Sequence, residues 1–470
     1  MIRLTVLVRR YTGRPLYCRR PCHICLNMGS AGILSILILL CSAAGLLFCP
    51  ARLWADHQKD PLKSLIQTAM EHNPDLLAER ARLDAVEKRP SQAGALPDPT
   101  AEMEFSDLPV NHLDASDALS KGISFGVTQK IPFPGVLRLR SEKASQEVET
   151  ERARLLTLES QITGEIKKAA FEYALYKDLL TINDETREAL GAAEKGARAA
   201  YISGAGAQPD ILLAQTAITR TESERETLER QKDIMRERIE SLLGAGVDKG
   251  LLEGLCLNEP RDLPALDVLL KRLPGAPQIK AALSGVNETR TQMALAKKAF
   301  YPEFEVGARY RYKDMSMGGS NYLTAVAGIT IPWFHWKDRY RPALEEAAAE
   351  KESARFRVDS VMTASRYALA DSYQEAARNL KIYRLFKNGL LLQAGQAYKS
   401  ALANYQVGKV DFTTLLKALT DLYRDEADTL SAKAGYYKAT AGIETVLGAN
   451  PESLHAVPDG LKIMEKGETK

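Results

Sequence analysis

The sequence predicts a mainly helical protein with two pairs of strands, built from one unit that occurs twice. Each unit has the order helix, strand, strand, long helix and return helix. Three observations support this class. Residues in the two halves match at a spacing of about 200, two very long segments are rich in good helix formers and contain no proline, and four short segments alternate apolar with polar residues.

The first 55 residues differ in composition from the rest of the chain. They hold seven arginines but no Lys, Asp or Glu, and six of these arginines precede an apolar run from Ala31 to Ala51. This order indicates a secretory signal peptide at 1–55, cut near Ala55, although a run of this length could also remain as a membrane anchor. Without those seven arginines the 63 basic residues of the chain fall to 56, against 60 acidic residues. The remaining chain is slightly acidic, which gives a nucleic-acid partner no electrostatic support.

The duplication is clearest in the second half of each unit. Matching positions keep one constant spacing of 204 residues, namely Tyr201 with Tyr405, Gly204 with Gly408, Leu212 with Leu416, Arg220 with Arg424, Glu222 with Glu426, and Leu243-Gly244 with Leu447-Gly448. Earlier in the unit, Ile131-Pro132-Phe133 corresponds to Ile331-Pro332-Trp333. We therefore predict a first repeat at 56–255, a second at 256–450 and a C-terminal tail at 451–470.

Four strands are expected from period-two patterns, at about 100–108, 122–131, 303–313 and 322–331. In the third strand the aromatic and aliphatic residues alternate with charged ones: Phe304, Val306, Tyr310 and Tyr312 against Glu303, Glu305, Arg309 and Arg311. A sheet with one apolar face is usually half-buried in a soluble domain. Charge inside and aromatics outside are also typical of transmembrane barrel strands, so the strand pattern alone leaves both interpretations open.

Long helices are expected at about 137–201 and 338–404, and return helices at about 209–245 and 411–448. The first long helix carries apolar residues at spacings of three and four: Leu155, Leu158, Ile162, Ile166, Ala169, Ala170, Tyr173, Tyr176 and Leu180. Such a narrow stripe, surrounded by charge, predicts that this helix packs against other helices.

Each long helix is bounded by chain-reversal or chain-breaking residues. Gly204 and Gly408 permit the backbone turn that stops a helix, and Asp411 can cap the helix that follows. At the other end, Pro132, Pro134 and Pro332 stop a strand, and Gly135 allows a sharp turn.

In this order and duplication, the motifs resemble the TolC-like outer membrane efflux family. The residues that carry the resemblance are NPDLLAERARLDAVE, the ALPDP entry to the first strand, the QKIPFPG strand exit, and YISGAGAQPDILLAQ with its echo after Tyr405. The resemblance covers about Leu62 to Gly448. The IPFPGVLRLR segment leans towards the heavy-metal efflux branch of the family, although no metal ligands support this.

The resemblance implies a homotrimer. Three chains would supply twelve strands to a transmembrane β-barrel, and the long helices would continue as an α-helical tunnel across the periplasm. The partners implied are a periplasmic adaptor protein, a proton-driven inner-membrane efflux pump and outer-membrane lipid.

The resemblance also implies the roles of particular residues. The helix tips would form the periplasmic entrance and the adaptor-docking site: Tyr201, Gly204, Asp210, Tyr405, Gly408, Lys409 and Asp411. The barrel lumen would be lined by Glu102, Glu104, Glu303, Glu305, Arg309 and Arg311. The strand-to-helix breaks would be Pro132, Pro134, Gly135 and Pro332. Trp333, Phe334 and Trp336 would form a membrane-interface belt, with core packing as the alternative.

No catalytic, cofactor-binding or metal-binding constellation is predicted. The histidines are scattered, no glycine loop has phosphate-binding spacing, and Met315 and Met317 suit a solvated loop better than a soft-metal site. We expect a passive duct that conducts small toxic molecules or metal ions. A duct for secreted peptides or proteins would share this fold, and a soluble periplasmic coiled-coil scaffold is the alternative from another class.

Overall fold

The computed structural model describes residues 60–105, 123–312 and 320–448. The predicted signal peptide, Met315, Met317 and the tail from residue 451 lie outside these ranges. The predicted first repeat contains α1 (Pro61–His72), α2 (Pro74–Val86), α3 (Arg89–Gly94), β1 (Thr100–Phe105), β2 (Ile123–Ile131), α5 (Val136–Ile202), α6 (Gln208–Leu243) and α7 (Lys249–Glu253). The predicted second repeat contains α8 (Leu266–Arg272), α9 (Pro277–Lys298), β3 (Phe304–Tyr312), β4 (Tyr322–Ile329), α10 (Arg341–Leu385), α11 (Leu391–Gln406) and α12 (Phe412–Leu447). The mainly helical class with a small antiparallel sheet is confirmed.

The first long helix, α5, is continuous over 67 residues, which corresponds to about 100 Å at 1.5 Å per residue. Its counterpart in the second repeat is divided. A π-helical turn at Phe386–Leu390 separates α10 from α11, and α10 begins only at Arg341. Gly389 lies in this turn, and glycine is a poor helix former. The single helix expected at 338–404 is thus two helices joined by a wider turn.

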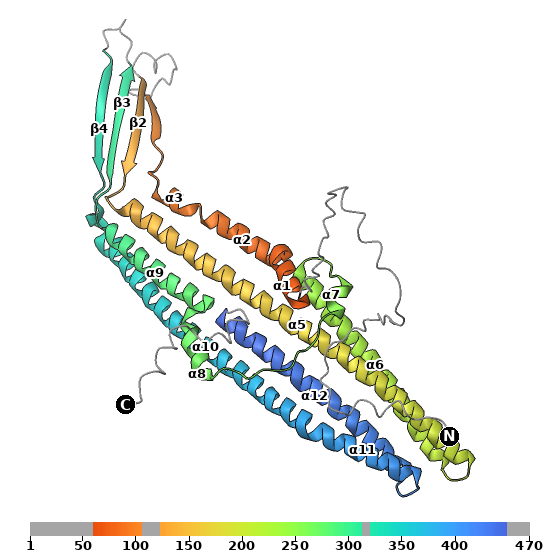
Figure 1. The fold of residues 1–470 in the computed structure, drawn as a ribbon. Coiled ribbons are helices and arrows are strands. Elements are labelled where there is room, and N and C mark those ends of the chain that lie inside the picture. Colours follow the sequence, from red (N-terminus) through yellow and green to blue (C-terminus); the bar gives the residue numbers. More distant parts are fainter. Residues whose placement is uncertain (1–59, 106–122, 313–319, 449–470) are drawn as a thin grey trace, which may run out of the picture. The chain divides into compact units, whose positions relative to one another are not determined.

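Two similar cores hold the helices together, one in each repeat. In the first, Ile166 of α5 is fully buried among residues of α1, α6 and α7, including Leu65, Ile239 and Leu252. In the second, Leu369 of α10 is buried with Ile279 of α9 and Ile443 of α12. The apolar stripe expected on α5 therefore packs within its own chain, and Figure 1 shows α5 running alongside α6, α9 and α12.

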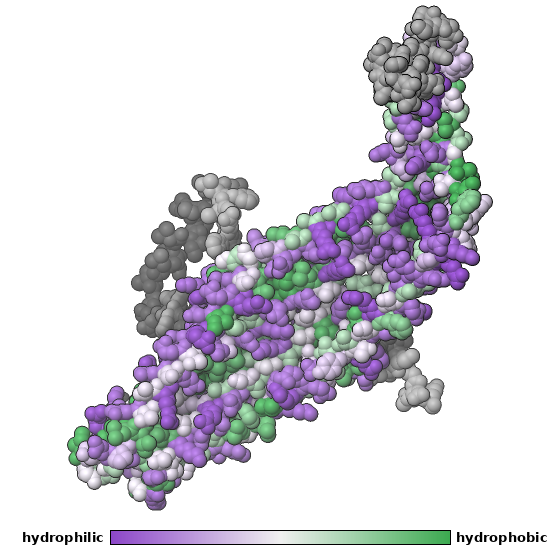
Figure 2. Space-filling view, turned by 180° about the vertical axis from the view of Figure 1, so that it is seen from behind, coloured by the Kyte–Doolittle hydropathy of each residue, from purple (hydrophilic) through white to green (hydrophobic). Residues whose placement is uncertain are grey.

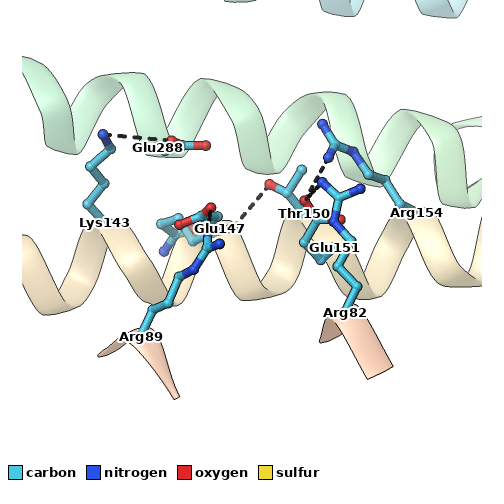
Figure 3. Close-up of polar contacts among 9 residues, drawn as sticks. Arg82, Arg89, Lys143, Glu147, Thr150, Glu151, Arg154 and Glu288 are labelled. Atoms are coloured by element: carbon cyan, nitrogen blue, oxygen red, sulfur yellow. Dashed lines mark hydrogen bonds and ion pairs between the residues drawn. The ribbon is translucent and has the colours of Figure 1, made fainter. Parts of the chain in front are cut away.

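Ion pairs fasten the short helices of the first repeat to α5. Arg82 of α2 and Arg154 of α5 both bind Glu151, with N–O distances of 3.2 and 2.7 Å, although the Glu151 side chain is only 5% exposed. Arg89 of α3 pairs with Glu147, and Lys143 approaches Glu288 of α9 at 4.0 Å. Figure 3 shows these side chains meeting along one stretch of α5, which sets the register of α2, α3 and α9 along the long helix.

The two repeats meet where α5 crosses α12. The Lys167 ammonium lies 2.5 Å from a Glu444 carboxylate oxygen; the Lys167 side chain is buried, and the Glu444 side chain is 12% exposed. Beside this pair, Gly164 of α5 faces Thr445 of α12. A Cβ atom at position 164 would lie 1.9 Å from the Thr445 hydroxyl. A glycine is therefore required for this close approach, and the buried pair fixes which positions meet.

The four strands form one antiparallel sheet in the order β1-β2-β3-β4. The central pairing joins the repeats, because β2 of the first pairs with β3 of the second over nine residues, from Ile123 with Tyr312 to Ile131 with Phe304. Each outer strand, β1 and β4, pairs on one side only among the described residues. The sheet therefore has two open edges.

We predict that Ile166→Ala destabilises the helical part by about 2–5 kcal/mol, because the truncation leaves a cavity in a core that is fully closed at this position. Leu156→Ala on the same helix is the matched control, since Leu156 is 45% exposed and the change should cost less than about 1 kcal/mol. Denaturant unfolding followed by circular dichroism measures both. Equal losses for the two variants would show that the stripe is not the core of the bundle.

Candidate functional site

The sheet exposes its apolar face, and on its polar face the buried residues, among them Ser124 and Thr128, belong to β2. The apolar residues of alternating positions are all exposed: Met103, Phe105, Phe125, Val127, Phe304, Val306, Tyr310, Tyr312, Leu323 and Ile329. Leu323 reaches 77% exposure, whereas Ser124 on the opposite face is 2% exposed. On the face drawn in Figure 2, hydrophobic residues gather along the sheet, while hydrophilic ones cover much of the helices. This is the reverse of a sheet in a water-soluble domain.

Charged side chains of both signs lie on the polar face, and they remain partly exposed. Arg309 of β3 reaches across β2 to Glu104 at 3.0 Å and Glu102 at 3.6 Å, both on β1. The residue between them is Gly126, where a Cβ atom would stand 3.5 Å from the Arg309 Nε, an ordinary van der Waals contact. The Arg309 side chain thus links three strands.

The remaining residues predicted for the lumen divide into two groups. Glu305 and Arg311 share the face of Arg309, opposite Lys130 and Ser124 respectively. Glu303 precedes β3, which begins at Phe304, and its backbone carbonyl accepts a hydrogen bond from Thr330 at 2.9 Å. The polar face of the sheet therefore combines three acids, Glu102, Glu104 and Glu305, with three bases, Lys130, Arg309 and Arg311.

The two strand-to-helix breaks follow different paths. After β2, Pro132 and Pro134 end the strand, and Gly135 adopts a φ of 90° that leads directly into α5. After β4, Pro332 opens a short 3-10 turn to His335 and a π-helical turn follows at Trp336–Tyr340 before α10 begins. His335 stands where the first repeat has Gly135, and its φ is −110°. Without glycine the direct left-handed turn is strained, so the second break takes the longer path.

The end of α9 joins both breaks through aromatic contacts that the sequence analysis did not identify. Tyr301 stacks on Phe133 with ring centroids 4.5 Å apart, and the Lys298 ammonium lies over both rings. Phe300 contacts Trp336 at 4.9 Å. Trp333 and Phe334 are 67% and 85% exposed, so core packing within this chain is excluded for these two residues.

The helix tips reverse with the same backbone geometry. Gly204 and Gly408 have φ values of 75° and 72°, and the amide of each donates to the carbonyl of the tyrosine three residues earlier at 3.0 Å. Asp411 caps α12 by accepting a hydrogen bond from the Thr414 amide at 3.1 Å. Hydrogen bonds from Thr414 hold the pKa of Asp411 below its usual range.

The tips pack against each other, and this contact makes the two repeats unequal. Phe412 and Ala214 are buried in a small cluster with Ala197, and Tyr405 packs against it. Burial, and then the nearby charge of Asp210, raise the pKa of Tyr405. Asp210 thus lies in the first turn of α6 as a neighbour of the other tip rather than as a cap. Tyr201, by contrast, is 49% exposed, and Lys409 is exposed as well.

The segment between α7 and α8, here called the linker, is fixed by a polar cluster that no sequence motif indicated. Glu259 accepts hydrogen bonds from the Tyr383 hydroxyl at 3.0 Å and from the Lys387 ammonium at 2.5 Å. Burial alone would raise the pKa of Glu259, but these two donors keep it below its usual value. Lys387 belongs to the π-helical turn, so the linker is tied to the interruption between α10 and α11.

The described residues contain no group of three or more His, Cys, Asp or Glu side chains placed to hold a metal ion. In the same ranges, no helix combines the length and the apolarity needed to cross a membrane.

Comparison with known proteins assigns the family. The sequence model described as outer membrane efflux protein matches residues 65–245 and 270–449, one match in each repeat. The chain belongs to this family. Its place is accordingly the outer membrane, and its relatives are efflux channels rather than enzymes.

Individual relatives are distant in sequence but similar in fold. The chain is 21% identical over 397 residues to the cobalt-zinc-cadmium resistance protein CzcC of Cupriavidus metallidurans, covering 82% of this chain and 90% of CzcC. The structure of CusC aligns with a TM-score of 0.70 at 18% identity, covering 83% and 92% of the two chains. The open state of the MtrE outer membrane channel of Neisseria gonorrhoeae aligns with the same score and identity, covering 83% and 89%.

We predict that Val306→Arg costs about 2–4 kcal/mol of stability in a bilayer, because Val306 lies mid-strand on the exposed apolar face. Arg309→Ala on the same strand should cost less than about 1 kcal/mol, since its ion pairs with Glu102 and Glu104 remain partly solvated. Urea titration of the protein folded into lipid vesicles compares the two. Similar losses would contradict the assignment of the apolar face to lipid.

Proposed function

We propose that this chain is the outer-membrane duct of a tripartite efflux system and that it works as a homotrimer. The observation that carries the proposal is the reversed sheet, whose apolar face is exposed and whose two edges are open. An open edge cannot lie in lipid, because its amide and carbonyl groups would have no hydrogen-bond partners. Three chains joined β1 to β4 would close twelve strands into a barrel and satisfy both edges.

The polar face of the sheet would then line the barrel. Its three acids and three bases leave it close to neutral, and Arg309 is already paired with Glu102 and Glu104. Such a lining would bias passing ions weakly without holding one tightly. This supports passive conduction, with the energy for export supplied elsewhere.

The long helices would extend the barrel as a periplasmic tunnel. The helices α5 and α10 begin near the sheet. Each leads to a tip, where the chain reverses into α6 or, after α11, into α12, and the two tips pack against each other. Exposed apolar residues at these tips, Ile202 at 79% and Val407 at 66%, favour contact with a protein partner. We assign this partner as a periplasmic adaptor that connects the entrance to a proton-driven inner-membrane pump.

For the cargo, the relative named for cobalt, zinc and cadmium resistance favours metal ions, with small toxic molecules as the broader class. A duct for secreted peptides remains the second candidate, because it would use the same fold. The reversed sheet argues against a soluble coiled-coil scaffold. Purified protein in a planar bilayer tests the duct directly: we expect single-channel conductance from trimers, and trimers without conductance would contradict the proposal.

A deletion strain complemented with this gene would identify the cargo. Restored resistance to divalent metal ions, without restored peptide secretion, would support the metal assignment.

At the tip, we predict that Gly408→Arg leaves outer-membrane trimers at normal levels but abolishes export. Nothing lies within 4 Å of a Cβ atom at this position, so the arginine has space in the chain itself, but its bulk would block a close-packed partner. Gly408→Asn is the matched control, since asparagine tolerates a positive φ and adds less bulk. Immunoblots of membrane fractions and export assays separate the effects. Normal export by Gly408→Arg would place adaptor docking elsewhere.

A further inference from the structure

A cavity of about 470 Å³ opens where the second pair of strands meets the helices. Its walls are mostly aromatic and aliphatic, and its lining includes Phe300, Tyr301, Trp333, Trp336 and Leu344, with Lys297 contributing the charge. The contact of Phe300 with Trp336, and the centroid distance of 5.8 Å from Phe300 to Tyr340, hold the inner wall in place. The cavity therefore has a firm apolar wall and a cationic group.

The position of the cavity continues the exposed apolar face of the sheet. Pro302, which also lines it, stands two residues before β3, and Trp333 stands four residues after the end of β4. Phe304 and Ile329, paired at this end of the sheet, are both exposed on the apolar face. The cavity therefore lies next to the end of the sheet at which the apolar face is exposed.

The cavity lies in a predominantly basic region. Between 297 and 303 and between 333 and 341, Lys297, Lys298, Lys337, Arg339 and Arg341 outnumber Glu303 and Asp338. Arg341 pairs with Glu345, and Lys298 lies over Phe133 and Tyr301. Lys297 and Lys337 form no ion pair with another residue of the described ranges. An occupant with an apolar tail and an anionic head would match both the wall and the rim.

We propose that this cavity binds one anionic glycerophospholipid, with its acyl chain against Trp333 and Phe300 and its phosphate at Lys297. The assignment rests on the proposed outer-membrane duct, in which this end of the sheet faces the periplasmic leaflet. Membrane-surface lysines contribute about 1 kcal/mol each to binding of anionic lipid, or about fivefold in affinity.

Tryptophan fluorescence can test the site because the chain has three tryptophans, and Trp54 lies in the predicted signal peptide, which leaves Trp333 and Trp336. The purified trimers are mixed with dibrominated phosphatidylglycerol or dibrominated phosphatidylcholine, whose bromines quench nearby tryptophan. We expect phosphatidylglycerol to quench at lower mole fraction than phosphatidylcholine. Lys297→Gln should reduce this preference about fivefold.

Lys271→Gln is the matched control. Lys271 lies in the last turn of α8, so the 22 residues of α9 separate it from the cavity, and its removal should leave the preference unchanged. Equal quenching by the two lipids, or an unchanged preference in Lys297→Gln, would overturn the anionic site.

Absence of quenching by either lipid would overturn it too, and would show that a neighbouring subunit covers the cavity. Conductance measured on the same trimers separates these results from a failure of the proposed duct, because conducting trimers without lipid preference overturn only the lipid site.

Discussion

The exposed apolar face of the four-stranded sheet is the constraint on which the rest of the structure depends. Large apolar and aromatic side chains stand exposed on that face, while charged residues such as Arg309 and Arg311 share the opposite face with Gly126 and Ser124. Such a sheet gains nothing from water on its apolar side, and within the described residues its two edges have no strand partner. In the proposed trimer, lipid and further copies of the chain would satisfy both needs at once, and the long helices would start from the rim of a barrel.

The duplicated halves share a plan but not a local structure. At the strand exits, Gly135 turns directly into α5, whereas His335 forces a 3-10 turn and a π-helical turn before α10. At the tips, Tyr405 is packed between the hairpins while Tyr201 is exposed. The two repeats therefore differ in structure. The first contains the uninterrupted helix α5. The second contains the aromatic turn before α10 and the π-helical turn between α10 and α11, which lies beside the linker.

Between these ends, the two halves are held in one register by a buried contact. The Lys167–Glu444 pair lies beside the close approach of Gly164 to Thr445. A buried ion pair adds little net stability, because desolvation of the two charges offsets their attraction. Removing one partner would be costly, however, so the pair selects the one alignment of α5 and α12 in which both charges are satisfied. That alignment also brings the tips to the same level.

The sequence by itself determined the duplication, the apolar stripe on α5, the two faces of each strand and the residues that stop each element, because these follow from periodicity and from the backbone limits of proline and glycine. Only the tertiary structure decided that the apolar face of the sheet is exposed, since alternation is the same for a half-buried and a lipid-facing strand. It also decided that Asp210 approaches Tyr405, that Arg309 reaches Glu102 and Glu104, and that Phe300 and Tyr301 join the two strand exits. These contacts join residues far apart in the chain, and no local pattern encodes the packing that brings them together.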